Sequence, residues 1–321
     1  MIKRCCYLAT AVVLALGGLA EGQESSEVND LAKGKKKEIP PFTWVSPATQ
    51  WKLKRCPDEL QHGTFQSPSM KESVGYYIYL PPGYDLDEEV CYPVVYHLHG
   101  GRPGSEQKSI ELSTFVDAAI RAGKIPPTIY VFPNGGPMSW YDYPKKELGM
   151  GESIFVEELI PHIDETYRTW GTSSGRALEG FSQGGRGTTR IGFGHPELWS
   201  SIAPGGSGYE PEKRIQENEG WESDSIQFLP LGYNAWDLAS EYAARKNSAE
   251  TAPLPVLLWV GTKGFNYEYN LKFSAFLEEL NVAHELHEEP DVGHSAKEIY
   301  DQSGERIMLF HQKHFRPESE D

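Results

Sequence analysis

The sequence predicts an α/β protein built on a mostly parallel central sheet with helices on both faces. Short apolar segments of strand length alternate along the chain with longer segments whose apolar residues recur three and four positions apart. This alternation is typical of parallel strands joined by crossover helices. Two of the strand-like segments, 92–98 and 129–132, are apolar almost throughout, as expected of strands covered on both faces. Because parallel sheets carry ligands at the carboxyl ends of their strands, the residues after each strand are the first candidates for a site.

The predicted elements follow one another in a regular order. The first firm strand is expected at 74–80, where aromatic and β-branched residues precede Pro81-Pro82-Gly83, a sequence that ends strands. The segment 209–228 is polar and interrupted by glycine, which predicts an insertion over the top of the sheet. The other expected strands are 92–98, 129–132, 176–180, 199–203, 256–260 and 284–288, and the expected helices are 110–122, 154–167, one beginning near 184, 271–280 and 296–314.

The amino-terminal region predicts export. Residues 1–20 are expected to be a secretory signal peptide, because two basic residues precede the apolar run 7–16 and small residues follow it. An uncleaved membrane anchor is the alternative, although the run is short for a bilayer span. Residues 21–50 are expected to form a flexible linker, rich in Glu, Ser, Lys and Gly at its start, and residues 51–321 a single domain. The protein is therefore expected to be secreted or periplasmic, without membrane attachment after cleavage.

Composition limits the partners. The chain has 30 Lys and Arg against 46 Asp and Glu, a formal net charge of −16, and this disfavours nucleic acid, whose binding depends on clustered cations. Removal of the signal peptide would leave Cys56 and Cys91, as one disulfide or as two free thiols. No Cys-x-x-Cys pair occurs, so no structural zinc is expected, nor any other metal or cofactor.

The most informative motif is Gly180-Phe181-Ser182-Gln183-Gly184, a G-x-S-x-G pentad between an apolar strand and a helix. In that context the pentad predicts a sharp turn with glycines where side chains would clash, so that the serine hydroxyl stands exposed at the edge of the sheet. Ser182 is therefore the candidate nucleophile. The alternative is a glycine-rich turn whose serine is buried or caps the helix.

A nucleophilic serine needs a base and donors for the developing oxyanion. His294 is the candidate base, because it lies in a glycine-containing loop after the last strand and follows the serine in the chain order of α/β-hydrolases. The amide of Gln183, directly after the serine, is one candidate oxyanion donor. The other is the amide of Gly101, in the Gly-Gly turn that follows the strand 92–98.

An acid that would orient the imidazole is not evident. After the strand 256–260, Gly264 occupies the position where an aspartate would meet the histidine. Glu268 is favoured as the acid because its longer side chain could reach back, and Asp291 and Asp237 are the alternatives. These three carboxylates also have ordinary interpretations, as a first-turn helix charge, a turn former and a helix N-cap respectively. A serine–histidine dyad is a further alternative, because loss of the acid alone leaves residual catalysis.

These motifs belong to a longer resemblance. From about Gln61 to Phe315 the chain resembles the secreted esterase family, also called esterase D-like, that includes feruloyl, acetylxylan and enterochelin-type esterases. The resemblance implies an α/β-hydrolase fold with Ser182 as nucleophile and His294 as base, and it places the family's aspartate on Gly264. The matching sequences are Tyr77-Ile78-Tyr79-Leu80-Pro81-Pro82-Gly83-Tyr84, Tyr96-His97-Leu98-His99-Gly100, Glu158-Leu159-Ile160-Pro161-His162-Ile163-Asp164, Gly180-Phe181-Ser182-Gln183-Gly184-Gly185, His195-Pro196-Glu197-Leu198-Trp199, Gly261-Thr262-Lys263 and Gly293-His294.

The resemblance also implies a function. The chain is expected to be a secreted serine carboxylesterase that hydrolyses acyl esters through an acyl-enzyme, with a small-molecule or polysaccharide ester as substrate and acetyl or feruloyl as the acyl group. Two alternatives stay open. One, motivated by Gly264, is a degenerate relative that binds a carbohydrate or an ester without turning it over. The other is an acyltransferase, which would have to exclude water from the site.

Overall fold

The computed structural model describes residues 42–142, 149–209, 232–247 and 253–317, which belong to one compact unit spanning 37–321. The predicted signal peptide and the first part of the predicted linker lie outside these ranges. In chain order the elements are α1 (Gln50–Leu53), β1 (Leu60–Gln66), β2 (Ser73–Tyr79), η1 (Tyr84–Leu86), β3 (Val94–Leu98), η2 (Ile110–Leu112), α2 (Ser113–Arg121), β4 (Ile129–Pro133), α3 (Gly151–Ser153), η4 (Ile154–Leu159), α4 (Ile160–Thr166), η5 (Ser173–Gly175), β5 (Arg176–Phe181), α5 (Gln183–Gly194), η6 (Pro196–Leu198), β6 (Ser201–Gly205), α8 (Ala235–Asn247), β7 (Leu257–Gly261), α9 (Tyr267–Glu279), β8 (Glu285–Glu289) and α10 (Ala296–His314).

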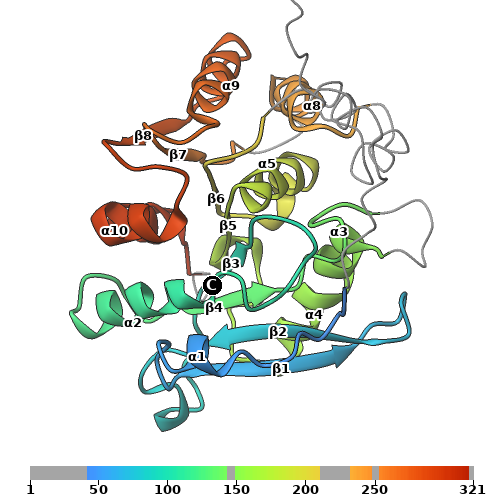
Figure 1. Cartoon of the computed structure of the whole chain (residues 1–321), viewed down its shortest axis with the longest axis vertical. Coiled ribbons are helices and arrows are strands. Elements are labelled where there is room, and N and C mark those ends of the chain that lie inside the picture. Colours follow the sequence, from blue (N-terminus) through green and yellow to red (C-terminus); the bar gives the residue numbers. More distant parts are fainter. Residues whose placement is uncertain (1–41, 143–148, 210–231, 248–252, 318–321) are drawn as a thin grey trace, which may run out of the picture. The chain divides into compact units, whose positions relative to one another are not determined.

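The strands form one eight-stranded sheet in the order β1-β2-β4-β3-β5-β6-β7-β8. The pairs β1–β2 and β2–β4 are antiparallel, and from β4 to β8 every neighbouring pair is parallel. Figure 1 shows α2 and α10 on one side of this sheet and α4, α5 and α8 on the other. The predicted α/β class, with a mostly parallel sheet covered on both faces, is confirmed.

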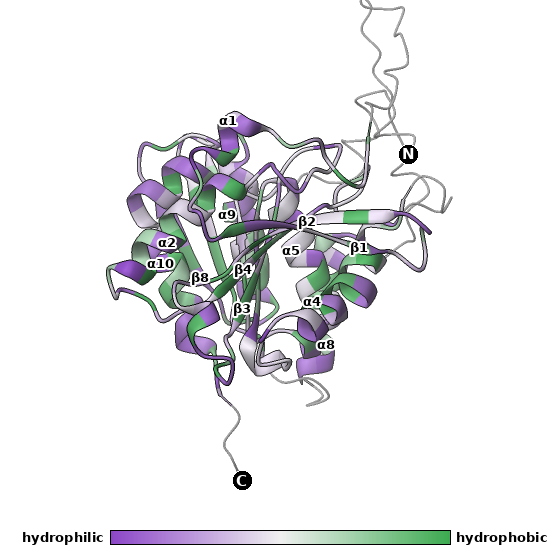
Figure 2. Cartoon of the chain, turned by 90° about the horizontal axis from the view of Figure 1, so that it is seen from below, coloured by the Kyte–Doolittle hydropathy of each residue, from purple (hydrophilic) through white to green (hydrophobic). Residues whose placement is uncertain are grey.

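Each face of the sheet has its own hydrophobic core, because successive side chains on a strand point to opposite faces. Along β3, Val94, Tyr96 and Leu98 pack on the face covered by α4, α5 and α8, whereas Val95 packs on the face covered by α2 and α10. Figure 2 shows the hydrophobic residues gathered in the strands and the hydrophilic residues on the outer helix surfaces. Burial on both faces explains why these strands read as continuous apolar runs rather than as alternating ones.

The sequence pattern did not predict β1. Its residues, Leu-Gln-His-Gly-Thr-Phe-Gln, are mostly polar, and only Phe65 is fully buried. As an edge strand, β1 is held by its seven-residue antiparallel pairing with β2, and a pattern search based on apolar residues does not see such pairing.

The predicted boundary between linker and domain at residue 50 needs correction. Trp44 is buried, with 5 % of its surface exposed, and its carbonyl oxygen accepts hydrogen bonds from the Gly75 amide at 2.8 Å and the Asn134 amide at 3.1 Å. The segment 42–49 therefore packs on the domain as a strap, a name kept below for these residues. The buried Trp44 indole and these long-range hydrogen bonds therefore order residues that were expected to belong to the linker.

Both described cysteines are free thiols. The Cys56 thiol lies 3.6 Å from the Ile110 carbonyl oxygen, and Cys91 is exposed just before β3. Of the two alternatives expected from the sequence, the structure shows the two free thiols. Within the described ranges, no helix is long and apolar enough to cross a membrane.

Candidate active site

Ser182 lies at a sharp corner between β5 and α5. Its backbone angles are φ 61° and ψ −115°, in a region that non-glycine residues rarely adopt and that stores strain at functional sites. The turn fits only because glycines flank it. A Cβ atom at Gly184 would lie 1.8 Å from the Leu98 carbonyl oxygen, and one at Gly100 would lie 3.0 Å from the Ser182 Cβ atom. The two loops therefore approach each other at backbone distance.

The structure brings Ser182 and His294 together. His294 lies between β8 and α10, and its Nε2 atom is 2.9 Å from the Ser182 hydroxyl oxygen. The imidazole lies between two phenyl rings, with ring centroids 4.7 Å away for Phe181 and 4.2 Å away for Phe265. Phe265 keeps 75 % of its surface exposed, so its ring both contacts the imidazole and faces solvent. This pairing of hydroxyl and imidazole is the geometry of an activated serine.

The two candidate oxyanion donors lie on facing loops. Gln183 is the first residue of α5, where a backbone N–H has no acceptor within the helix and the helix dipole favours negative charge. Gly101, with φ 68°, belongs to the turn that approaches Ser182 through Gly100. Its carbonyl oxygen is held by the Ser139 hydroxyl at 2.6 Å. Acyl transfer requires N–H donors beside the attacked carbonyl group, and both loops that carry the candidate donors adjoin Ser182.

His99 fixes the turn that carries Gly101. Its Nε2 atom accepts hydrogen bonds from the amides of Gly135 at 3.1 Å and Ser105 at 3.3 Å, so the proton belongs on Nδ1, which lies 3.1 Å from the Gly100 carbonyl oxygen. Burial and the positive charge of Lys108 lower the pKa of His99 to about 3. A permanently neutral imidazole thus acts as a structural connector between two loops.

None of the three predicted acids hydrogen bonds to His294 in the part of the chain that the structure describes. Glu268 is exposed in the first turn of α9. Asp291 is exposed and pairs with Lys263 at 2.8 Å, and this hydrogen bond lowers its pKa. Asp237, in the first turn of α8, accepts a hydrogen bond from the Asn234 side chain at 2.7 Å. The geometry therefore does not support the preference for Glu268, because a first-turn helical carboxylate points into solvent here.

Gly264 does lie beside the histidine loop. A Cβ atom built on it would be 3.8 Å from the Gly293 carbonyl oxygen and 3.0 Å from the Gly261 carbonyl oxygen. The position that the family resemblance assigns to the aspartate is thus close to His294 in space as well as in the alignment of motifs. In this chain it carries no side chain.

A buried polar cluster connects the elements that carry the site. Glu179, on β5, is directly opposite His97 on β3, and its carboxylate lies 2.7 Å from the His97 Nδ1 atom. The same carboxylate accepts a hydrogen bond from the Tyr300 hydroxyl and lies 3.4 Å from the Nε2 atom of His311, both on α10. β3 leads to the oxyanion turn, β5 leads to Ser182, and α10 follows the loop that carries His294. The cluster therefore fixes the positions of these three parts of the site relative to one another.

The charge state of this cluster follows from its surroundings. Burial alone would raise the pKa of Glu179, but hydrogen bonds and charges from His311 and His97 outweigh burial and bring the pKa down to about 2. The carboxylate is therefore ionised at neutral pH despite being fully buried. The sequence shows Glu179 as one polar residue in a buried strand, and only the register of β3 against β5 reveals its partner.

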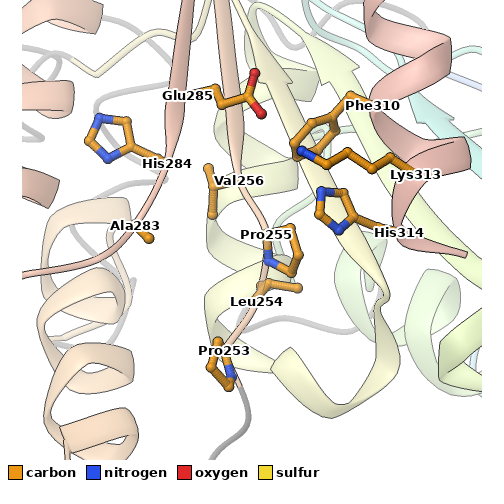
Figure 3. A pocket seen from close by; sticks show the side chains of 10 residues that line it. All are labelled: Pro253, Leu254, Pro255, Val256, Ala283, His284, Glu285, Phe310, Lys313 and His314. Carbon is orange, nitrogen blue, oxygen red and sulfur yellow. The ribbon is translucent and has the colours of Figure 1, made fainter.

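A pocket of about 300 Å³ lies elsewhere in the structure (Figure 3). Its lining includes Val256, just before β7, and Glu285, at the start of β8. Because these strands run parallel to β5, the pocket lies at the amino ends of the strands, whereas Ser182 lies at their carboxyl ends. It is not the active site. No cluster of three His, Cys, Asp or Glu side chains suited to a metal ion is found among the residues described.

The fold and the corner serine paired with a histidine define the chain as an α/β-hydrolase of the serine type. Comparison with known proteins makes the assignment more specific. The chain belongs to the esterase family whose model, described as "Putative esterase", matches residues 67–310. The family resemblance expected from the sequence is thereby confirmed.

Two curated relatives illustrate the family. The chain is 35 % identical over 141 residues to Esterase Rv1288 of Mycobacterium tuberculosis strain ATCC 25618 / H37Rv, a match that covers 41 % of this chain and 29 % of the relative. It is 30 % identical over 163 residues to an endo-1,4-beta-xylanase/feruloyl esterase of Xylanibacter ruminicola, covering 48 % of this chain and 22 % of the relative. The match thus spans less than a third of either relative's length.

Solved structures share the fold. A ferulic acid esterase superposes with a TM-score of 0.66 at 20 % identity, covering 79 % of this chain and 97 % of that one. The S-formylglutathione hydrolase FrmB from Staphylococcus aureus superposes with a TM-score of 0.65 at 16 % identity, covering 78 % and 98 %. At these identities the likeness establishes the architecture alone.

Proposed function

We propose that the chain is a secreted serine carboxylesterase that removes acetyl or feruloyl groups from polysaccharide through an acyl-enzyme. The observation that carries this proposal is the 2.9 Å contact between His294 Nε2 and the Ser182 hydroxyl at a strained strand-to-helix corner. The family assignment supports ester hydrolysis. The polysaccharide substrate draws on the xylanase/feruloyl esterase relative, and secretion draws on the amino-terminal sequence.

In the first half of the reaction, His294 Nε2 takes the proton of the Ser182 hydroxyl as the oxygen attacks the ester carbonyl carbon. The negative charge that develops on the carbonyl oxygen is stabilised by the backbone N–H groups of Gln183 and Gly101. When the tetrahedral intermediate collapses, the bond to the alcohol breaks and protonated His294 gives its proton to the leaving alcohol. The acyl group remains on Ser182.

In the second half, water replaces the alcohol. His294 removes a proton from the water molecule as its oxygen attacks the acyl carbon, and the same two N–H groups stabilise the second oxyanion. Collapse breaks the bond to the serine oxygen, which recovers a proton from His294. The products are a carboxylic acid and the regenerated hydroxyl, so no cofactor or oxidant is needed.

A fluorophosphonate probe and a small aryl acetate test this mechanism together. The probe should label Ser182, and Ser182→Ala should abolish labelling and lower kcat for the acetate by about 10⁴-fold or more. The Thr188→Ser variant, altered further along the same helix, serves as a control that should keep both activities. Labelling at another residue, or hydrolysis that survives Ser182→Ala, would contradict the assignment of the nucleophile.

The acyl group and the location need separate measurements. Chromatography of products from feruloylated arabinoxylan and acetylated xylan should show free ferulate or acetate, released by the native protein and not by Ser182→Ala. Expression of the full chain, followed by amino-terminal sequencing of the exported protein, should show cleavage near residue 20. Retention of the whole chain in a membrane fraction would instead favour the anchor.

A further inference from the structure

Two lysine ammonium groups lie at the loop that carries Gly101. Lys108, in that loop, donates from Nζ to the carbonyl oxygens of Pro103 at 2.6 Å and Gly100 at 3.3 Å. A Cβ atom at Gly101 would lie 3.3 Å from the same nitrogen. Lys52, on α1, donates to the Gln107 carbonyl oxygen at 3.2 Å. Both ammonium groups therefore contact the loop that contains Gly101, whose amide is a candidate oxyanion donor.

The two cations are close enough to repel each other. Loss of water around the ammonium and, as a smaller effect, the positive charge of Lys52 together lower the pKa of Lys108 to about 8. In the described ranges both lysines are anchored on backbone carbonyl oxygens, and neither forms an ion pair with a carboxylate. An ammonium has three donors, so hydrogen-bonding capacity remains on both. An anion at this place would relieve the repulsion and use those donors.

An exposed indole adjoins the cations. Trp51, also on α1, keeps 56 % of its surface exposed, and the Lys52 Nζ atom is 5.7 Å and the Arg55 guanidinium carbon 5.2 Å from its ring centroid. Figure 2 shows α1 at the upper end of the view, beyond the ends of the strands. Arg55 is paired with Glu111 at 3.4 Å, so Lys52 is the cation beside this indole that has no carboxylate partner among the described residues. The exposed part of an indole can stack a sugar ring while a neighbouring ammonium pairs with an acidic substituent.

The chain as a whole is strongly acidic, with a net charge of −16, and would repel an acidic polymer at long range. Salt limits that repulsion, because exposed charges farther apart than about 8 Å are screened at physiological ionic strength. At contact distance the nearby lysines, Lys52 and Lys108, determine whether the acidic polymer is attracted or repelled. A pair of neighbouring lysines on an acidic protein therefore selects ligands by the position of their negative charges rather than by their total charge.

We propose that Trp51, Lys52 and Lys108 form a subsite for a polysaccharide segment that carries a uronic acid carboxylate near the acylated sugar. The carboxylate accepts from the two ammonium groups while a neighbouring sugar ring lies on Trp51, which places the ester beside the oxyanion turn. This inference rests on the proposed esterase function. It makes acidic glycans, rather than neutral ones, the favoured substrates.

The test compares two acetylated xylo-oligosaccharides of equal length, one with and one without a glucuronic acid branch. The wild-type protein should show a higher kcat/KM for the branched substrate, and the ratio of the two values should fall about fivefold in Lys52→Ala and in Trp51→Ala. Raising the salt concentration to 0.5 M should lower the wild-type ratio as well, since rim charges are screened. Lys54→Ala, at an exposed position at the end of α1, is the matched control and should keep the ratio.

Equal kcat/KM for the two oligosaccharides, or a preference that both variants retain, would overturn the subsite. Calorimetry with Ser182→Ala separates this failure from failure of the proposed function. If Ser182→Ala binds the branched oligosaccharide more tightly than the unbranched one but the wild-type protein hydrolyses neither, the subsite stands and the esterase assignment falls. If the wild-type protein hydrolyses a small aryl acetate and Ser182→Ala binds both oligosaccharides equally, the esterase assignment stands and the subsite is refuted.

Discussion

Glu106 holds the strap 42–49 against the loop that carries the oxyanion turn, and Glu106→Gln tests this attachment. The Glu106 side chain is fully buried and accepts four hydrogen bonds. Its Oε1 atom accepts from the Ser46 amide at 2.7 Å and lies 3.2 Å from His62 Nε2. Its Oε2 atom accepts from the Ser46 hydroxyl at 2.7 Å and the Asn134 side-chain amide at 3.0 Å.

Glutamine keeps the shape of Glu106 but turns one acceptor into a donor. If the NH₂ group takes the Oε1 position, it faces the Ser46 amide, which cannot reverse its role. If it takes the Oε2 position, it faces the Asn134 amide, whose own oxygen is held by the Gly136 N–H at 3.1 Å. Either orientation leaves a buried donor unpaired, which costs about 1–3 kcal/mol. We therefore expect the free energy of unfolding to fall by about 2–3 kcal/mol, because charge-assisted hydrogen bonds are lost too.

Urea unfolding followed by tryptophan fluorescence measures this loss, and kcat for a small aryl acetate reports on the oxyanion turn. Glu111→Gln is the matched control. Its carboxylate is partly exposed and lies 3.4 Å from Arg55, so its loss should change stability by less than about 0.5 kcal/mol. If Glu106→Gln unfolds at the same urea concentration as the wild-type protein, the strap is not held as described and the reasoning fails.

Three further predictions concern the site. Glu268→Gln should keep kcat/KM within about twofold, because its exposed carboxylate makes no described contact with His294; a loss near 10⁴-fold would restore it as the acid. Glu179→Gln should lower the free energy of unfolding at pH 7 by about 3 kcal/mol. The Glu179 pKa lies at about 2 in the folded state against an ordinary 4.5, so its stabilisation is present above pH 4.5 and lost as the pH falls towards 2. Between pH 2 and pH 4.5, the free energy of unfolding of Glu179→Gln, measured with urea, should therefore change less with pH than that of the wild-type protein. If the two proteins change in parallel with pH, Glu179 is not an ionised carboxylate in the folded state. Because the exposed Phe265 ring contacts His294, it is placed to stack on an aromatic acyl group, so Phe265→Ala should lower the kcat/KM ratio of aromatic to acetyl esters about fivefold. An unchanged ratio would show that the Phe265 ring does not contact the acyl group.

Local patterns in the sequence were sufficient for the fold and for the serine corner. Six of the seven predicted strands could be predicted because burial on both faces makes them apolar, whereas β8 is mostly polar and partly exposed. The pentad around Ser182 forms its turn from adjacent residues. His294 could be predicted as a partner because strands that run parallel end at one edge of the sheet, so residues 112 positions apart come into contact there. These predictions use only chain-local chemistry and topology.

The remaining features depend on contacts between distant segments. In the sequence, Glu106 and Glu179 look like ordinary charged residues. Glu106 gains its buried hydrogen bonds only when the strap packs against it, and Glu179 only when β3 pairs with β5. The acid was predicted from its distance along the chain to Gly264, the position where the aspartate was expected. That criterion favoured Glu268, whose place in the first turn of α9 sends the side chain to solvent instead. Register and helix orientation decide such cases, and neither can be read from composition.

The corner at Ser182 makes the folded chain less stable than a relaxed turn would. A non-glycine residue at positive φ costs about 1–3 kcal/mol, a sizeable share of the 5–15 kcal/mol that keeps a typical domain folded. Glycine would adopt these angles without strain, but it has no hydroxyl. Selection for the reaction and selection for stability therefore oppose each other at this position, and a descendant of this chain that no longer needed the reaction would be expected to drift towards glycine there.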